Sequence, residues 1–505
     1  MTSKRRIIRM AALAAATLVA VGLSTAMAQT PTAPTTAPAP AAAPAVAPAP
    51  TPEECERASL TGDISDFIKK SKQPCEYLKW GADARLREVF TPNLLLDRED
   101  RHFQRYRLRT WATVTPTPDV DINVRLVYEP KHFCQPSREA FTRNAAYLDE
   151  WTTSEAIVDQ LNVVYRKAFG LPVTLKVGRQ DIILGDGWLV LDGTPLDGSR
   201  TIFFDALRAT IDLADYKTKV DVIGICQSAD SSDTLSAICD KDFHNIEQDE
   251  MGAIVYVSNT SLPKTQIDGY FIYKHDEQVI GRKLGDVSPG NVAPWQVGAN
   301  ADIYTVGMRV AGDITDHWKY RAELAKQCGH KNGRDLDAWG FNSRLSYFCN
   351  DEKNNNFRVA YEYLSGDALG SGTDEQFDPL WGRWPQFSEL LAYTVALENR
   401  PGEQTNLHRV GAGWSFNPCK DPALEFCLDY HLLFRDKKVT SFGRDESYFD
   451  NGCFKGQLVT ALLKYKFNDH VSGHLIGEVF APGDFYNDTR NETAGFFRYE
   501  LTFTW

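Results

Sequence analysis

The feature that most constrains this chain is a two-residue periodicity, which recurs in segments of about ten residues between Trp80 and Trp505. In the segment 497–505, aromatic or aliphatic residues fill every odd position and polar residues fill every even one. Neighbouring side chains of a β-strand point to opposite faces, so such a segment is typical of a strand with one apolar and one polar face. Turns rich in Asp, Asn, Gly and Pro separate the segments. The pattern predicts an all-β fold, an antiparallel β-barrel of about 18 strands.

The use of the two faces distinguishes a membrane barrel from a soluble β-domain. A soluble barrel or propeller holds its apolar side chains inside and exposes its arginines to water. Lipid satisfies no backbone polar group, so a membrane barrel must be closed and must carry its apolar face outside. The length of the strands and an export signal favour a barrel of the bacterial outer-membrane type. The last strand also ends on Trp505 and resembles the recognition signal that such barrels present to their assembly machinery. After Lys79 no stretch of 18 apolar residues occurs, so no membrane helix is expected.

The N-terminal region has the composition of an export signal followed by a spacer. A basic start is followed by a short apolar run and by Ala26-Met27-Ala28, the three parts of a secretory signal peptide. The next residues are almost purely Pro, Ala and Thr, which favours an extended linker where a periplasmic partner could bind. The predicted organisation is a signal peptide at 1–28, a linker at 29–53, a short N-terminal segment at 54–78 and the barrel at 79–505.

Charge and cysteine content limit the kinds of partner and site. The chain has 55 Lys and Arg against 67 Asp and Glu, which argues against nucleic acid as a partner. Ten cysteines in an exported chain suggest disulfides. The candidate pairs are Cys55 with Cys75, Cys226 with Cys239, Cys328 with Cys349, and Cys419 with Cys427.

The sequence contains little that points to catalysis or metal binding. It has no C-x-x-C, no H-E-x-x-H and no G-x-S-x-G. Asp181, Asp186 and Asp192 form an acidic series, but their spacing matches no calcium loop. We therefore predict no catalytic residue, no cofactor and no metal site.

The polar faces of the predicted strands are rich in arginine. Arg105, Arg107 and Arg109 alternate with Tyr106 and Leu108 and would point together into the lumen. Guanidinium groups lower the barrier for anions and bind carboxylates bidentately. The alternative is that these arginines only pair with Asp83, Asp121, Glu323, Glu362 or Glu500 across the lumen. The predicted pore-lining arginines are Arg85, Arg87, Arg105, Arg107, Arg109, Arg125, Arg179, Arg208, Arg321, Arg344, Arg358, Arg409 and Arg498.

Two blocks of sequence resemble the alginate export family of outer-membrane proteins. The first is Gly178-Arg-Gln-Asp-Ile182 with Gly185-Asp-Gly-Trp-Leu189 and Arg200-Thr-Ile-Phe-Phe-Asp-Ala-Leu-Arg208. The second is Tyr361-Glu-Tyr-Leu-Ser-Gly-Asp367 with Phe377-Asp-Pro-Leu-Trp-Gly382. The resemblance implies a monomeric barrel of eighteen strands with an electropositive constriction through which an anionic uronate polymer leaves the cell. It also implies that Arg179 and Arg208 line the pore with Asp205 as an acidic neighbour.

The function expected from these features is an outer-membrane channel for an anionic, alginate-like polysaccharide or oligosaccharide. The linker, the cysteines and the acidic loops depart from a dedicated alginate exporter, so the solute and the direction of transport stay open. An uptake porin for small anions or saccharides is one alternative. An outer-membrane enzyme or a structural barrel is the alternative from another class. A catalytic site inside the lumen would favour the enzyme, and a plugged lumen without a basic stripe would favour the structural barrel.

Overall fold

A computed structural model describes most of the chain from residue 67 onward, and the chain divides into two compact units, Met1–Glu76 and Tyr77–Trp505. The predicted signal peptide and linker, and also Cys55 and Cys239, lie outside the described residues. The described residues are 67–68, 70–96, 98, 100–135, 151–152, 156–191, 203–228, 235, 238, 248–277, 300–368, 370–382, 385–394, 404–438, 449–450 and 452–505.

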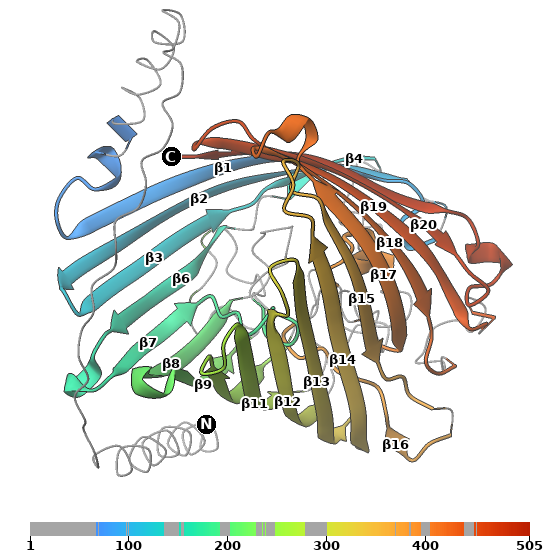
Figure 1. The fold of residues 1–505 in the computed structure, drawn as a ribbon, viewed down its shortest axis with the longest axis horizontal. Coiled ribbons are helices and arrows are strands. Elements are labelled where there is room, and N and C mark those ends of the chain that lie inside the picture. The colour runs from blue at the N-terminus through green and yellow to red at the C-terminus, as the bar shows by residue number, and fades with distance from the viewer. Residues whose placement is uncertain are drawn as a thin grey trace, which may run out of the picture. The chain divides into compact units, whose positions relative to one another are not determined.

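The second unit is a single β-barrel, whose strands are labelled in Figure 1. Its wall contains 18 antiparallel strands, as the alternation predicts. They are β1 (Leu78–Thr91), β2 (Arg101–Thr117), β3 (Val120–Tyr128), β6 (Ala156–Tyr165), β7 (Val173–Gln180), β8 (Phe204–Leu213), β9 (Thr218–Gln227), β10 (Glu250–Asn259), β11 (Thr265–Asp276), β12 (Ala301–Asp313), β13 (Trp318–Lys331), β14 (Arg334–Phe348), β15 (Asn356–Leu364), β17 (Leu407–Phe416), β18 (Leu424–Phe434), β19 (Phe454–Lys466), β20 (Val471–Pro482) and β21 (Ala494–Thr504).

Shorter elements complete the unit. The strand β4 (Lys131–Gln135) continues beside β2 after β3 has ended, and β5 (Trp151–Thr152) pairs with β4 just before β6. The two-residue β16 (Thr373–Asp374) pairs in parallel with β14. No helix in the described part of the chain is long and apolar enough to cross a membrane. The helices among the described residues of this unit are α3 (Leu390–Thr394) and the 3-10 turns Leu94–Leu96, Ala168–Gly170, Ala214–Tyr216, Pro418–Lys420 and Asp488–Arg490.

The barrel closes where its first strand meets its last. Each wall strand pairs with the next along the chain, and β1 pairs with β21 in antiparallel register, with Asp83 opposite Thr504 and Phe90 opposite Phe497. This closure leaves no free sheet edge, which is the condition for a sheet to stand in lipid.

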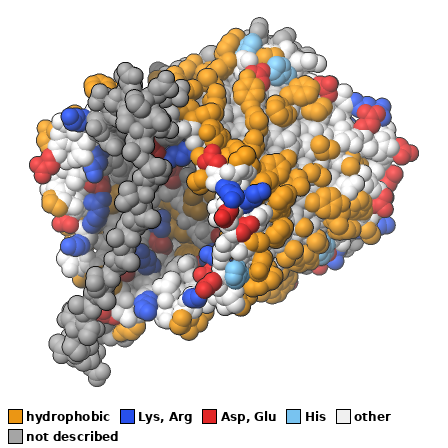
Figure 2. Space-filling view, turned by 45° about the horizontal axis from the view of Figure 1, so that its top comes forward, with side chains coloured by type: hydrophobic (Ala, Val, Ile, Leu, Met, Phe, Trp, Pro, Cys, Tyr) orange, Lys and Arg blue, Asp and Glu red, His pale blue; other side chains and the backbone are white. Residues whose placement is uncertain are grey.

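The wall is apolar outside and charged inside. On β1, Leu86 and Phe90 are 43% and 39% exposed, whereas Arg85 and Arg87 are 1% and 3% exposed. The same alternation follows the other strands, and Figure 2 shows hydrophobic side chains gathered over the outer surface. Such a surface is costly in water but is matched to the hydrocarbon of a bilayer. The predicted inversion of the two faces is therefore confirmed.

The two ends of the barrel differ in the length of their connections. At the end where β1 begins, hereafter the turn end, residues 118–119 join β2 to β3 and residues 467–470 join β19 to β20. At the other end, hereafter the loop end, residues 277–300 and 365–406 separate neighbouring wall strands. Outer-membrane barrels place their short turns in the periplasm and their long loops outside the cell.

Candidate functional site

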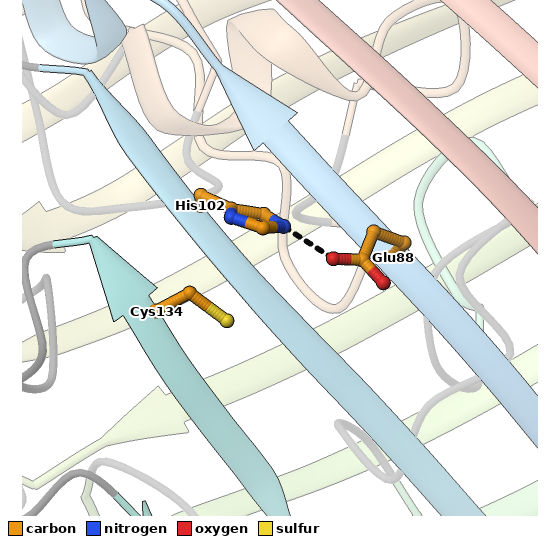
Figure 3. A group of neighbouring side chains, drawn as sticks. All are labelled: Glu88, His102 and Cys134. Carbon is orange, nitrogen blue, oxygen red and sulfur yellow. Dashed lines mark hydrogen bonds and ion pairs between the residues drawn. The ribbon is translucent and has the colours of Figure 1, made fainter.

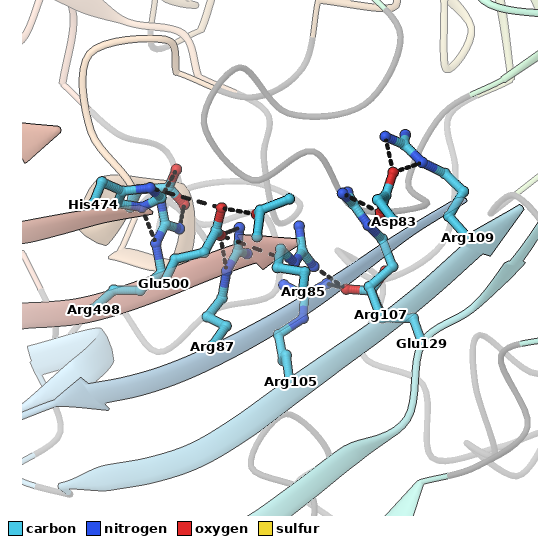
Figure 4. A network of polar contacts seen from close by, with 12 residues as sticks. Asp83, Arg85, Arg87, Arg105, Arg107, Arg109, Glu129, His474, Arg498 and Glu500 are labelled. Carbon is cyan, nitrogen blue, oxygen red and sulfur yellow. Dashed lines mark hydrogen bonds and ion pairs between the residues drawn. The ribbon is translucent and has the colours of Figure 1, made fainter. Parts of the chain in front are cut away.

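A row of arginines runs along the inner face of β21, β1 and β2 and is shown in Figure 4. The register places Arg85 opposite Arg107, Arg87 opposite Arg105, and Asp83 opposite Arg109. The periodicity of the strands points these side chains inward together, because residues opposite each other in a sheet share a face. With Arg498 of β21, these residues form what we call the arginine ladder: Arg85, Arg87, Arg105, Arg107, Arg109 and Arg498.

Carboxylates hold the arginine ladder in place. Glu129 is fully buried and lies 2.6 Å from Arg85 and 2.9 Å from Arg105. Arg87 donates to Glu500 at 2.5 Å. Desolvated guanidinium groups this close repel one another, and shared carboxylates offset that repulsion.

Asp83 accepts from the two remaining arginines of β2. Arg107 contributes an ion pair of 3.0 Å and Arg109 one of 2.6 Å. Arg498 pairs with Glu389 at 3.1 Å. Among the residues that the structure describes, the six guanidinium groups of the ladder thus pair with four carboxylates.

The lumen is narrowed by two inward-folded loops, here called the plug, which are residues 181–191 after β7 and the described residues of 365–394 after β15, namely 365–368, 370–382 and 385–394. Trp188 stacks on Phe377 with 5.5 Å between ring centroids, and the Trp381 amide donates to the Leu189 carbonyl at 3.0 Å. A Cβ on Gly382 would lie 1.9 Å from the carbonyl oxygen of Trp188, so only glycine allows this approach. The two blocks that are far apart in sequence therefore pack as one body inside the barrel.

Charged wall residues fasten the plug to the barrel. The Trp188 indole donates to Glu362 at 3.1 Å, and the Trp381 indole donates to Glu250 at 2.9 Å. Lys331 pairs with Asp378 at 2.8 Å. A buried polar group needs a partner, so these indoles and carboxylates fix the position of the plug as well as its packing.

Asp186 connects the tip of the first loop to two wall arginines. Its carboxylate lies 2.8 Å from Arg309 and 3.1 Å from Arg321. Burial by itself would raise the pKa of Asp186, but hydrogen bonds from Arg309 and the charge of Arg321 outweigh burial and hold that pKa below its ordinary value. The aspartate is therefore ionised and paired at neutral pH.

The second loop ends in α3, which is anchored through a fully buried carboxylate of β20. Glu478 accepts from the Ser388 hydroxyl at 2.6 Å and from the Leu390 amide at 2.8 Å. Beside it, the Arg409 guanidinium lies 4.3 Å above the Phe387 ring. The pair of Glu389 with Arg498 joins this segment to the arginine ladder.

A cavity of about 480 Å³ remains between the plug and the wall formed by β13 to β20. Its plug side contributes Trp188, Phe377, Gln386 and Phe387. Its wall carries uncharged donors and acceptors together with basic and acidic residues. The basic residues are Arg321, Arg344, Arg358, Arg409 and Lys464, and the acidic residues are Glu362, Glu425, Asp429 and Glu478.

Arg344 differs from the other basic residues of the cavity. Arg358 binds Asp429 with both ends of its fork, at 2.9 and 2.5 Å, and Arg409 pairs with Glu362 at 2.9 Å. Arg344 makes no hydrogen bond or ion pair with any residue that the structure describes, and its side chain is exposed to the cavity. Its guanidinium is available to a solute.

The remaining predicted pore residues fall into two groups. Arg125 pairs with Asp159 and Asp181, and Arg208 pairs with Asp221 at 2.8 Å, both on the inner face. Together with the ladder and the cavity arginines they lie where the alternation predicts. Asp181, a member of the acidic series to which the sequence assigns no role, is thus a partner of a lumen arginine.

Arg179 and Asp205 do not join this lining. They are opposite each other in the register and pair at 2.9 Å, but they share a face with Val177 and Leu207, which are 51% and 37% exposed on the outside. Phe204, the neighbour of Asp205, is the residue that points inward. The motif match took them for pore residues, whereas the two-residue period of the strands places them on the outer side of the wall.

The predicted disulfides with both cysteines described are not formed. Cys328, Cys349, Cys419 and Cys427 are all free thiols. Cys328 lies near the loop end of β13, while Cys349 follows β14 at the turn end. Proximity in sequence does not bring cysteines together when a strand separates them along the barrel axis.

The plug, and the hydrogen bonds and ion pairs that hold it to the wall, were not predicted from the sequence. Trp188, Phe377 and Trp381 stand in blocks that carried the family resemblance, yet nothing in their local pattern predicts that they meet. The available signal was their composition, because clustered Trp, Phe and Gly between strands are unusual for loops exposed to water.

Comparison with known proteins gives a family and a fold. A family model described as alginate export matches residues 76–499. No curated protein matches the chain. Similar solved structures include the outer membrane protein opdK from Pseudomonas aeruginosa, with a TM-score of 0.50 and 10% identity over 85% of this chain and 100% of that chain. OccAB2 from Acinetobacter baumannii has a TM-score of 0.52 and 9% identity over 84% of this chain and 98% of that chain. At these identities the likeness shows the shared barrel fold.

Proposed function

The chain belongs to the alginate export family, and on this premise we propose that it passes an anionic, alginate-like polysaccharide or oligosaccharide through its arginine-lined lumen. The observation that carries the proposal is the row of inward guanidinium groups, from the arginine ladder to Arg344, which has no partner among the described residues. A cationic lining lowers the barrier for an anion and raises it for a cation. The proposal contains no chemical step.

The pairing of most arginines supports passage rather than tight binding. Guanidinium groups bind carboxylates bidentately. Carboxylates of the wall therefore compete with the carboxylates of a solute for the same guanidinium groups. A polymer that carries one carboxylate on each sugar can then exchange partners from one arginine to the next. Asp83, Glu129 and Glu500 provide this competition along the ladder.

The cavity chemistry supports a saccharide. Arg344 offers a free fork for a carboxylate, and Asn342, Ser346 and Gln386 offer groups that hydrogen-bond hydroxyls. Phe387 adds an apolar surface for a sugar ring. The volume of about 480 Å³ lies within the range of small-ligand sites. The lining therefore fits a short stretch of a polysaccharide chain at a time.

The test is the reversal potential of the purified protein in a planar bilayer under a salt gradient. We expect anion selectivity in the wild type and block by added oligouronate. Changing Arg105, Arg107 and Arg109 together to Gln should move the reversal potential toward that of a non-selective pore. Arg344→Gln should weaken the block by about tenfold to a hundredfold, because it removes one charge-assisted contact worth about 1.5–3 kcal/mol.

Arg98→Gln is the matched control, since Arg98 is an exposed loop arginine paired with Glu492 at 3.1 Å. It should leave selectivity and block unchanged. A cation-selective wild-type pore, or block that Arg344→Gln does not alter, would contradict the proposal.

Uptake of small anions is the second candidate, and the narrowing of the lumen by the plug favours it. A small carboxylate that permeates freely while oligouronate neither blocks nor permeates would select this alternative. The crystal structure of Pseudomonas aeruginosa OpdK with vanillate, with a TM-score of 0.50 and 10% identity over 84% of this chain and 98% of that chain, suggests vanillate as the probe.

We also propose a route by which the chain reaches the membrane. Residues 1–28 direct export, the barrel assembly machinery inserts the chain into the outer membrane as a monomer, and the linker at 29–53 offers a site for a periplasmic partner. Size determination of the mature protein in detergent and N-terminal sequencing test the monomer and the cleavage after Ala28.

A further inference from the structure

A cluster of metal-binding side chains lies on the outer face of the wall, away from the lumen, and is drawn in Figure 3. Glu88 comes from β1, His102 from β2 and Cys134 from β4, and their ligand atoms all lie within 4.8 Å of one another. Their strand neighbours Val89, Phe103 and Phe133 are buried inside, so these three side chains point outward. The transport function uses none of them.

From this geometry we propose that Glu88, His102 and Cys134 bind a zinc-type divalent ion near the loop end of the barrel. Zinc takes thiolate, imidazole and carboxylate ligands in tetrahedral geometry. Its bond lengths place such donors roughly 3.3–3.8 Å apart, so the cluster needs only small side-chain rotations to close on an ion.

The surroundings of Glu88 support a ligand role. Its Oε1 contacts His102 Nε2, and its Oε2 accepts from the Gln104 amide at 3.0 Å and from the Tyr499 hydroxyl at 3.2 Å. Tyr106 donates in turn to Gln104 at 2.6 Å. Hydrogen bonds to the second oxygen orient a carboxylate for a metal on the first, which is the usual outer shell of a metal site.

His132 lies next to the thiol but outside the group of three. Its Nδ1 is 3.6 Å from Cys134 Sγ and 3.2 Å from Gln104 Oε1, and its ring stacks on Trp151 at 4.4 Å. Because Nδ1 contacts both Cys134 and Gln104, His132 orients the thiol from the outer shell, and water takes the fourth position of the ion. One imidazole, a thiolate and a carboxylate around a divalent ion give a neutral complex, which suits a site at the border of lipid and water.

The ion would join strands that the sequence keeps far apart. It would connect β4, the last described strand before residues 136–150, to β1 and β2. A metal bound only to the folded state stabilises that state by mass action. The ion would therefore stabilise the strand arrangement at the loop end. Its binding would not depend on a solute in the lumen.

Cobalt titration of the folded protein in detergent tests the proposal. The protein is first stripped with a chelator and kept reduced with a non-chelating reductant. We expect one cobalt ion for each chain, with a thiolate-to-cobalt absorption band in the near ultraviolet that zinc displaces. Cys134→Ser should abolish the band, and Glu88→Gln and His102→Gln should each weaken cobalt binding at least tenfold, the lower bound for outer-shell changes.

Two further variants separate a built site from adventitious binding. Cys328→Ser removes another exposed thiol of the outer wall and should leave the band intact. Gln104→Ala should weaken binding by about tenfold without changing the stoichiometry. Heat-modifiable gel mobility shows that each variant is folded. The absence of a band in the wild type, a band that survives Cys134→Ser, or equal loss in Cys328→Ser would overturn the proposal.

Discussion

At the scale of single residues, the lumen arginines differ by whether a carboxylate already binds them. Arg409 is held by Glu362 at 2.9 Å and Arg358 by Asp429, whereas Arg344 has no partner among the described residues. A paired guanidinium adds little to the field that a solute meets, because its partner cancels much of the charge. The selectivity for anions should therefore depend on how many lumen arginines are paired with carboxylates, as well as on how many arginines the lumen contains.

Removing a lumen carboxylate should strengthen the preference for anions. Glu362→Gln keeps an acceptor for the Trp188 indole but deletes the charge that neutralises Arg409. We expect the reversal potential to shift toward stronger anion selectivity, opposite in sign to the shift of the variant in which Arg105, Arg107 and Arg109 are changed to Gln. Glu352→Gln, in an exposed turn, is the control and should leave the potential unchanged. A shift toward cations in Glu362→Gln would show that Arg409 does not contribute to the field of the pore.

At the scale of elements, the plug decides how wide the lumen is. Its first loop is held by packing against Phe377 and by the pairs of Asp186 with Arg309 and Arg321. Since the pKa of Asp186 in the folded protein is below its ordinary value, its pairing stabilises the closed loop fully above that ordinary value. The stabilisation disappears only when the pH falls through the lower, folded-state pKa.

The plug should therefore open in acid and not near neutral pH. We expect single-channel conductance to stay constant from pH 7 down to the ordinary aspartate pKa of 3.8 and to rise only below it. Asp186→Asn should show the higher conductance already at pH 7. Asp316→Asn, in an exposed turn at the opposite end of the barrel, serves as the control. Equal conductance of Asp186→Asn and wild type at pH 7 would mean that packing alone holds the loop.

At the scale of the whole molecule, the barrel depends on one seam between its first and last strands. Glu500 of β21 reaches across this seam to Arg87 at 2.5 Å, and its side chain is 12% exposed. Removing one partner of a buried ion pair leaves an uncompensated charge, which costs about 3–5 kcal/mol. The seam should therefore be sensitive to a single substitution.

Glu500→Ala should lower the stability of the closed barrel. We expect the temperature at which the folded, fast-migrating gel band disappears to fall clearly in this variant. Glu492→Ala removes a carboxylate from an exposed loop pair and should behave like the wild type. An unchanged transition in Glu500→Ala would show that backbone pairing of β1 with β21 is sufficient for closure.

The local pattern of the chain determined the wall. Alternation within each segment is a property of neighbouring residues, so the strand count, the outward aromatic residues and the inward direction of Arg105, Arg107 and Arg109 were predictable. The same rule places Arg179 outside, on the face of Val177, because the two residues are separated by two positions.

Contacts between distant segments were decided only by the tertiary structure. Residues 181–191 and 365–394 meet inside the barrel because closure arranges β7 and β15 around one lumen. No local sequence pattern predicts how far apart these two segments lie in the folded chain. Arg85 meets Glu129 because β2 lies between β1 and β3 and places the end of β3 beside β1. Glu88, His102 and Cys134 converge because β1, β2 and β4 are neighbours in the sheet. The sequence by itself determined which way each strand faces, since that depends on adjacent residues. Which charges are paired and which remain available depends on register and closure, and those exist only in the folded barrel.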